Sequence, residues 1–148
     1  MNIRLIGLDL DGTVFDSQKQ ISAATRQAIA EACAAGTAVL PVTGRPRAGL
    51  PKEFLSIPGV RYAITSNGGA VYDLAADRTL ALDPVNKEDA LWALRRTRVL
   101  GALTDVYVGG SAYTAESTFD ALVAAAPPAM RSYFVTTRTV VGDQIEWL

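Results

Sequence analysis

An apolar segment near the amino terminus stops abruptly at two aspartates, and this feature limits the folds open to the chain. Residues 3–8 are apolar at nearly every position, which is typical of a β-strand covered on both faces in a parallel sheet. Asp9 and Asp11 follow directly. Because alternate side chains of an extended chain point to the same side, both carboxylates can face one point. A buried strand that ends in two acids indicates a site at the carboxyl edge of a sheet.

The remainder of the first part of the chain alternates between expected strands and helices. The expected elements are strands at residues 37–42, 60–65, 70–73 and 79–82, and helices at 22–35 and 52–55. Ser22 is a suitable N-cap for the longer helix, and Gly36 suits the left-handed position after it. Pro41 is awkward inside a strand because it donates no ladder hydrogen bond. The alternation predicts an α/β fold with right-handed crossovers and a parallel sheet.

The pattern of expected elements changes after residue 82, and a second unit is expected there. Asp83-Pro84-Val85 is typical of a linker, and Gly109-Gly110 predicts a hairpin turn. The expected elements are helices at residues 87–100, 116–126 and from 143, and strands at 103–108, 111–115 and 132–140. The last strand is predicted from its β-branched residues. The chain is therefore divided into residues 1–82 and 83–148.

Three polar clusters fall at the expected carboxyl ends of the first three strands, at residues 9–13, 43–45 and 66–69. Ligands bind at this edge of parallel sheets. Two neighbouring carboxylates repel one another unless a cation lies between them, and Mg²⁺ is the hard cation best suited to the task. Gly12 lets the backbone turn sharply and lets a ligand approach. The chain has no histidine, which excludes Ser-His, Cys-His and His-zinc chemistry.

Charge and composition exclude several other classes of protein. The formal net charge is -1, which provides no broad basic surface for nucleic acid or anionic lipid. No apolar run approaches the ~20 residues needed to span a bilayer. Cys33 is the only cysteine, so an internal disulfide is impossible and a reducing cytoplasm is the expected location. We expect a small-molecule ligand, with no nucleic-acid or membrane partner.

The motifs resemble those of the haloacid dehalogenase-like phosphatases. Asp9-Leu10-Asp11-Gly12-Thr13 resembles the first motif of that superfamily, and Thr43-Gly44-Arg45-Pro46 resembles the second motif of one branch. Asn67-Gly68-Gly69, followed by Val71-Tyr72-Asp73, is similar to a signature of the same branch, the Cof-like type IIB sugar phosphatases. The resemblance implies a partial Rossmann-like, three-layer parallel-sheet core over residues 1–82. Residues 83–148 would then be an incomplete α+β cap of type IIB.

The resemblance also implies roles for individual residues. Asp9 attacks phosphorus to form an aspartyl-phosphate, and Asp11 protonates the leaving oxygen and then activates water. Asp9 and the backbone carbonyl of Asp11 bind Mg²⁺. Thr43 hydrogen-bonds the phosphoryl group, while Arg45 and Asn67 contact substrate or phosphate. The remaining residues assigned to the phosphate-binding loops are Leu10, Gly12, Thr13, Gly44 and Gly68. Asp16 and Asp73 are expected to be solvated.

Two later motifs of the family, a lysine and a Gly-Asp-x-x-x-Asn-Asp type segment, are not identifiable. Gly142-Asp143 begins like the second one, but the acidic pair is missing. The expectation is therefore a fragment or truncated product of a longer protein, with weak Mg²⁺ binding and poor turnover on its own. Two functions stay open. One is a phosphatase of small phosphate monoesters, with sugar phosphates as the expected class and a phosphomutase or phosphonatase as near variants. The other is a catalytically incompetent phosphate-binding or regulatory module.

Overall fold

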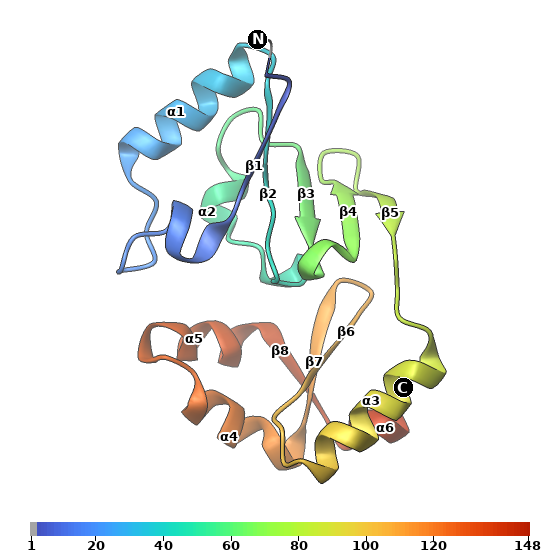
Figure 1. Ribbon diagram of the computed structural model, residues 1–148. Helices are drawn as coiled ribbons and strands as arrows, with labels where there is room; N and C mark the ends of the chain where they lie inside the picture. The colour runs from blue at the N-terminus through green and yellow to red at the C-terminus, as the bar shows by residue number, and fades with distance from the viewer. Residues whose placement is uncertain (1–2) are drawn as a thin grey trace. The chain divides into compact units, whose positions relative to one another are not determined.

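The computed structural model describes residues 3–148, which form two compact units (Figure 1). The first unit ends at Asp83 and the second is Pro84–Leu148, so the boundary falls inside the expected linker. Residues 1 and 2, which belong to the predicted first part, lie outside the described residues. No helix within residues 3–148 has both the length and the apolar character needed to cross a membrane.

The sheet of the first unit has a parallel part and an antiparallel part. Its strands are β1 (Leu5–Leu8), β2 (Ala38–Pro41), β3 (Tyr62–Thr65), β4 (Ala70–Asp73) and β5 (Arg78–Leu82). β1 pairs with β2 in parallel, and a parallel bridge between Val42 and Ile64 connects the end of β2 to β3. β3, β4 and β5 then pair antiparallel in sequence order. The prediction of an α/β fold with a parallel sheet is confirmed.

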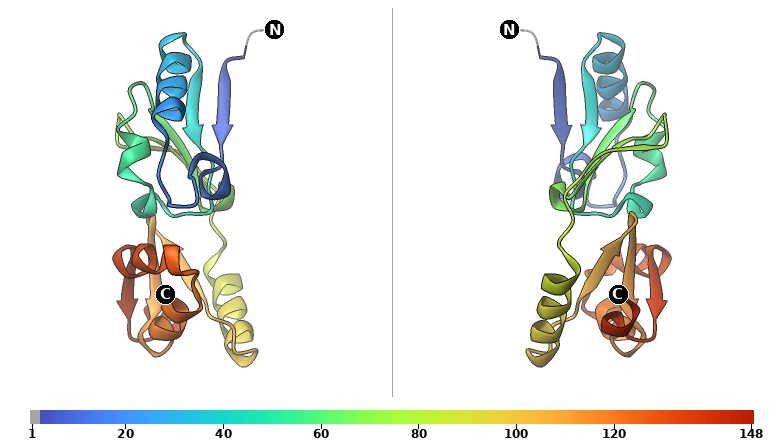
Figure 2. Two further views of the ribbon diagram at one scale, coloured as in Figure 1. Left: turned by 90° about the vertical axis from the view of Figure 1, so that its left-hand side faces the viewer. Right: turned by 90° about the vertical axis from the view of Figure 1, so that its right-hand side faces the viewer.

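Two helices lie on the same face of this sheet, α1 (Ala23–Ala34) and α2 (Lys52–Leu55) (Figures 1 and 2). The predicted N-cap is present, because the hydroxyl of Ser22 accepts a hydrogen bond of 3.1 Å from Thr25 N. Gly36 has the expected positive φ of 88°. Beneath the helices lies one apolar core, whose buried members include Leu10, Phe15, Ile29, Val39, Phe54 and Ala63.

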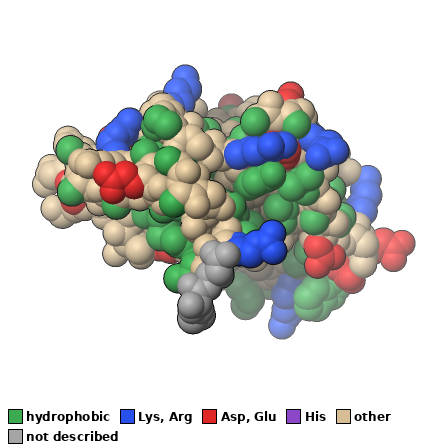
Figure 3. Space-filling model, turned by 90° about the horizontal axis from the view of Figure 1, so that it is seen from above, with side chains coloured by type: hydrophobic (Ala, Val, Ile, Leu, Met, Phe, Trp, Pro, Cys, Tyr) green, Lys and Arg blue, Asp and Glu red, His purple; other side chains and the backbone are tan. Residues whose placement is uncertain are grey.

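β1 differs from the strand covered on both faces that the sequence predicts. Among the described residues β1 has one neighbour, β2, and helices cover a single face. Ile6 and Leu8 pack against the core, whereas the side chain of Leu5 on the opposite face is 59% exposed. Apolar side chains are also visible beside Lys and Arg in the view from above (Figure 3). One face of β1 is therefore apolar but is not covered by any of the described residues.

Pro41 explains why β2 and β3 meet only at a bridge. Backbone N–H groups alternate between the two neighbours of a strand. Val42 N donates to Leu8 O in β1 at 2.8 Å, and Thr43 N donates to Ile64 O in β3 at 3.0 Å. By this alternation the nitrogen of Pro41 faces β3, where it has no hydrogen to donate. The β2–β3 ladder is consequently short and stands next to Thr43.

The second unit contains a three-stranded sheet in the order β6-β7-β8. The elements are α3 (Lys87–Val99), β6 (Asp105–Val108), β7 (Ser111–Ala115), α4 (Glu116–Ala125), α5 (Pro128–Thr137), β8 (Arg138–Val141) and α6 (Gln144–Trp147). β6 and β7 form the predicted hairpin, with positive φ at both Gly109 and Gly110. Asn86 caps α3 by accepting from Asp89 N at 2.9 Å. β7 pairs with β8 in parallel.

The predicted strand at residues 132–140 is wrong over most of its length. This segment is the end of α5, and only the short β8 follows it. Pro128 occupies the start of the helix, where its missing N–H costs nothing and its fixed φ is favourable. Thr136 satisfies its hydroxyl inside the helix by donating to Ser132 O at 2.8 Å. The helix start at Pro128 thus outweighs the β-propensity of the branched side chains that follow it.

Candidate active site

Asp9 lies at the carboxyl end of β1, where the chain leaves the sheet. The following segment, Leu10–Val14, makes one wide turn that closes when Phe15 N donates to Leu10 O at 3.0 Å, with non-helical backbone angles at Asp11 and Gly12. The carboxylate of Asp9 is exposed and accepts one contact, from Thr13 Oγ1 at 3.4 Å. The sequence predicts a loop here, and the structure adds this turn to it.

The residues around the two aspartates divide between core and surface. The side chain of Leu10 is fully buried in the core, so only its backbone is available to a ligand. Gly12 is exposed with a φ of 89°, and a Cβ built there would meet no heavy atom within 4 Å. A ligand can therefore approach the backbone of this turn closely, while the side chain of Leu10 anchors the turn to the sheet.

The loops at residues 43–45 and 66–68 are joined to one another. Ser66 N donates to Arg45 O at 2.9 Å, and Asn67 N donates to Thr43 O at 3.2 Å. A Cβ on Gly44 would lie 2.8 Å from Asn67 Oδ1, so a larger residue there would displace the Asn67 side chain. The buried hydroxyl of Thr43 accepts from Arg45 N at 3.2 Å and keeps its own proton for another acceptor.

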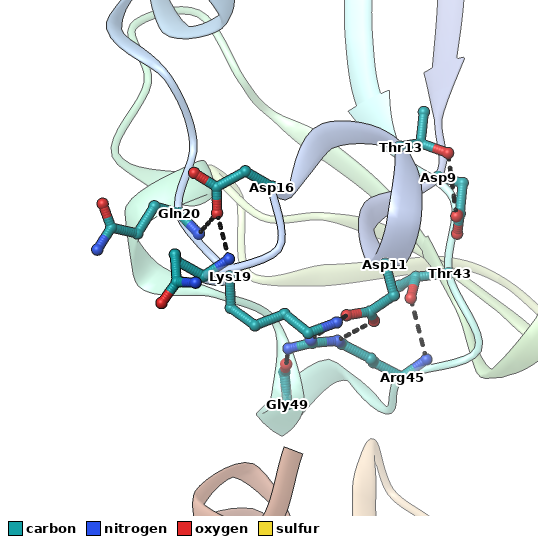
Figure 4. Close-up of polar contacts among 10 residues, drawn as sticks. Asp9, Asp11, Thr13, Asp16, Lys19, Gln20, Thr43, Arg45 and Gly49 are labelled. Carbon is teal, nitrogen blue, oxygen red and sulfur yellow. Dashed lines mark hydrogen bonds and ion pairs between the residues drawn. The ribbon is translucent and has the colours of Figure 1, made fainter. Parts of the chain in front are cut away.

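Arg45 connects these two loops to the aspartate turn (Figure 4). Its Nε lies 2.9 Å from Asp11 Oδ2 and its Nη2 lies 2.8 Å from Asp11 Oδ1, a bidentate arrangement. Arg45 also donates to Gly49 O at 3.3 Å and lies over the ring of Phe15. The hydrogen bond from Arg45 lowers the pKa of the Asp11 carboxyl, and a second one from Lys19 adds to the effect against partial burial. Asp11 is therefore ionised at neutral pH in this arrangement.

Lys19 is a member of this cluster that the sequence reasoning missed. Its Nζ lies 3.0 Å from Asp11 Oδ1, on the same oxygen that Arg45 Nη2 contacts. Lys19 has no motif around it, and a lysine in a polar loop carries no signal of its own. The two aspartates predicted to share one point do not do so through their side chains. Figure 4 shows Asp11 directed toward Lys19 and Arg45, while Asp9 is directed toward Thr13.

The oxygen atoms of the aspartate turn provide only part of the ligand shell that a hard cation needs. Among residues 3–148, no group of three or more His, Cys, Asp or Glu side chains is arranged to hold a metal. Mg²⁺ is usually bound through one or two carboxylates, with waters and substrate phosphate completing its shell. The exposed carboxylate of Asp9 and the backbone carbonyl of Asp11, two residues further along the chain, fit that pattern as two oxygen ligands. The carboxylate of Asp11 is occupied by its two cations.

Comparison with known proteins identifies the family. A sequence model described as haloacid dehalogenase-like hydrolase matches residues 6–121, a range that contains Asp9, Arg45 and Asn67. The chain belongs to this family. It is 33% identical over 119 residues to a Streptococcus pyogenes protein that carries the word phosphatase in its name, covering 78% of this chain and 44% of that protein. It is 34% identical over 85 residues to pyridoxal phosphate phosphatase YbhA of Escherichia coli, covering 57% of this chain and 31% of that one.

Solved structures of haloacid dehalogenase-like hydrolases share the fold. A Bacillus subtilis member has a TM-score of 0.80 at 21% identity, covering 99% of this chain and 56% of its own. A subclass IIB sugar phosphatase has a TM-score of 0.73 at 17% identity, covering 93% of this chain and 52% of its own. The chain thus spans about half the length of the structures it matches, and less than half of the named relatives.

A cavity in the second unit contains none of the predicted residues. It lies between α3, α4 and α6 and is lined by Leu94, Arg98, Thr104, Thr118 and Gln144, among others. The polar groups of the buried Gln144 are used within the unit, since its amide donates to Thr104 O at 2.9 Å and to Tyr113 O at 2.8 Å. None of the residues that line this cavity belongs to the aspartate turn or to the two loops joined to it.

Proposed function

We propose that this haloacid dehalogenase-like chain carries the nucleophile of a Mg²⁺-dependent phosphatase of small phosphate monoesters, with sugar phosphates as the expected class. The observation that supports it most is the exposed carboxylate of Asp9 at the end of β1, in the unit whose three polar loops are joined by hydrogen bonds. The named phosphatase relatives and the fold shared with a subclass IIB sugar phosphatase support the same class.

In the proposed reaction an oxygen of Asp9 attacks phosphorus, and the ester P–O bond breaks as the aspartyl-phosphate forms. The leaving oxygen takes a proton from Asp11, which has to be in its protonated form for this step, and Asp11 then accepts a proton from the water that hydrolyses the aspartyl-phosphate. The hydroxyl proton of Thr43 and the amide of Asn67 are the proposed contacts for phosphoryl oxygens. Mg²⁺, held by the Asp9 carboxylate and the Asp11 carbonyl, would neutralise charge on the phosphoryl group.

The experiment is hydrolysis of para-nitrophenyl phosphate by the purified chain with Mg²⁺ or with EDTA, for the wild type and for Asp9→Asn. The proposal expects slow hydrolysis that disappears in EDTA and in the variant. Lys52→Met, which changes an exposed residue of α2, is the matched control and keeps the wild-type rate. Hydrolysis that survives Asp9→Asn would exclude Asp9 as the nucleophile.

A phosphate-binding module without catalysis is the second candidate. It is favoured by one observation: Asp11, the proposed proton donor, is held as a carboxylate by two cations. In that state it has no proton to give to a leaving group. Binding of a phosphate ester by the chain without any turnover in Mg²⁺ is the result that selects the module over the enzyme.

A further inference from the structure

Asp11 accepts hydrogen bonds from two cationic side chains, which leaves one positive charge in excess among the three. Arg45 supplies two parallel N–H groups at 2.9 and 2.8 Å, and Lys19 supplies an ammonium at 3.0 Å. All three side chains are partly accessible, with 11% of Arg45, 31% of Lys19 and 34% of Asp11 exposed. A guanidinium can bind two oxygens of a carboxylate or two oxygens of a phosphate in the same bidentate way.

The loop that carries Lys19 is built to hold it in place. Lys19 has a φ of 60°, a conformation that is uncommon for a lysine. Asp16 holds the loop: its Oδ1 accepts from Gln18 N at 2.8 Å and from Gln20 N at 2.9 Å, and its carbonyl accepts from Lys19 N at 3.0 Å. Asp16 N in turn donates to Gln20 O at 3.0 Å. These four hydrogen bonds hold Lys19 in its left-handed conformation. Such conformations at residues other than glycine cluster at functional sites.

We propose that Lys19 and Arg45 form an anion site for the phosphoryl group, and that the Asp11 carboxylate occupies this site when no ligand is bound. A phosphate that enters the site takes over the guanidinium and the ammonium, and the Asp11 side chain is displaced. Lys19 thereby becomes a phosphate-contacting residue, alongside the proposed contacts from Thr43 and Asn67. The binding of phosphate stands on the geometry alone. The part of the displaced Asp11 in proton transfer rests on the proposed function, and the carboxylate has to take up a proton from solvent before it can donate one.

The charge balance supports the exchange. A carboxylate carries one negative charge, whereas a phosphate monoester carries close to two at neutral pH. Two cations that share one carboxylate therefore gain attraction when a dianion replaces it. The anchoring of Arg45 by Gly49 O and by the ring of Phe15 keeps the guanidinium in position while its partner changes.

The test is a titration of the whole chain with inorganic phosphate in EDTA, followed by the amide NMR shifts of residues 9–20 and 43–45. EDTA removes metal-bridged binding, and no turnover is required. Lys19→Met is expected to weaken phosphate binding about tenfold, the equivalent of one charge-assisted hydrogen bond. Lys19→Arg keeps the charge and retains most of the affinity. Lys52→Met is the matched control and leaves the dissociation constant unchanged.

Asp11→Asn gives the sharper result, because a structural ion pair and a competing anion predict opposite outcomes. Removal of the competing carboxylate is expected to tighten phosphate binding by about tenfold, although it changes a proposed catalytic residue. The proposal is overturned if Asp11→Asn binds phosphate no better than the wild type, or if Lys19→Met binds it as well as Lys52→Met. Failure to detect phosphate binding in both wild type and Asp11→Asn overturns it equally.

The two proposals fail separately. Phosphate binding with these variant effects, but without hydrolysis of para-nitrophenyl phosphate, rejects the phosphatase and keeps the anion site. The opposite result is Mg²⁺-dependent hydrolysis that is lost in Asp9→Asn, together with a phosphate affinity that the Lys19 and Asp11 variants do not change. That result keeps the phosphatase and rejects the anion site.

Discussion

The guanidinium of Arg61 binds both carboxylate oxygens of Asp73, with Nε 3.0 Å from Oδ1 and Nη2 2.6 Å from Oδ2. Asp73 ends β4 and is buried, so the expectation that it is solvated is wrong. Ala76 N also donates to its Oδ1 at 3.1 Å. The hydrogen bond from Arg61 lowers the pKa of Asp73 to about 2 against the effect of burial. The pair joins the start of β3 to the end of β4, next to the turn that leads into β5.

This pair makes the stability of the first unit depend on pH. The pKa of Asp73 is lower in the folded chain than its ordinary value near ~4, so its contribution is complete above about pH 4. It is lost as the pH falls toward 2, because protonation removes the charge that Arg61 binds. In urea denaturation followed at several pH values, Asp73→Asn should flatten the loss of stability between pH 5 and pH 2. Arg61→Gln should do the same, and a wild-type slope in both variants would contradict this assignment.

Gly59 and Gly36 form a matched pair for separating backbone strain from crowding. Both have positive φ, 87° and 88°, but a Cβ on Gly59 would lie 2.4 Å from Cys33 Cβ, whereas one on Gly36 meets nothing within 4 Å. Gly36→Ala should cost about 1 kcal/mol from the left-handed conformation alone. Gly59→Ala should cost about 1–3 kcal/mol more, because Cys33 Cβ is fixed to the backbone of α1 and either α1 or the loop at Gly59 has to shift. Urea midpoints of the two variants measure the difference. An equal loss of stability in both would contradict the prediction, because it would show that the contact with Cys33 is relieved at no cost.

The N-cap of α1 offers a test of local stability. Ser22 Oγ accepts from Thr25 N at 3.1 Å, and its loss leaves that amide without the partner. Ser22→Ala should lower the free energy of unfolding of the first unit by about 1 kcal/mol. Asn86→Ala removes the corresponding cap of α3 in the second unit and is the matched comparison. Amide hydrogen exchange should show faster exchange at the start of α1 in the first variant and at the start of α3 in the second.

A buried ion pair connects the two outer strands of the second unit across β7. Arg138, whose side chain is 3% exposed, donates to Asp105 Oδ2 from Nε at 2.9 Å and from Nη2 at 2.7 Å. The hydroxyl of Thr114 donates to the other oxygen of Asp105. Arg138→Met should destabilise this unit by about 3 kcal/mol or more, because it leaves a buried carboxylate without its cation.

The double variant Arg138→Met, Asp105→Leu tests the origin of that loss. Removing both charges should recover a substantial part of the stability, since two buried charges are costly to desolvate. Thermal denaturation of wild type, single variant and double variant gives the comparison. A double variant less stable than Arg138→Met would mean that packing, and not the uncompensated charge, dominates.

Short-range features of this chain could be predicted from its sequence. The caps at Ser22 and Asn86, the Gly109-Gly110 turn and the helix start at Asp143 all depend on contacts between residues a few positions apart. The order of strands and helices in the first unit follows from apolar periodicity for the same reason. Residues 132–137 are the exception, where β-branched side chains predicted a strand and Pro128 began a helix instead.

Contacts between distant segments were decided by the tertiary structure. Arg45 reaches Asp11 across 34 positions, and Lys19 reaches it only because the Asp16 loop folds back toward the aspartate turn. The Asp-x-Asp spacing pointed to two carboxylates that share a point, but the cations supplied by other loops turned Asp11 away from Asp9. Local pattern can place a charge at the end of a strand. The direction in which that charge points depends on its strongest partner, which no short stretch of sequence contains.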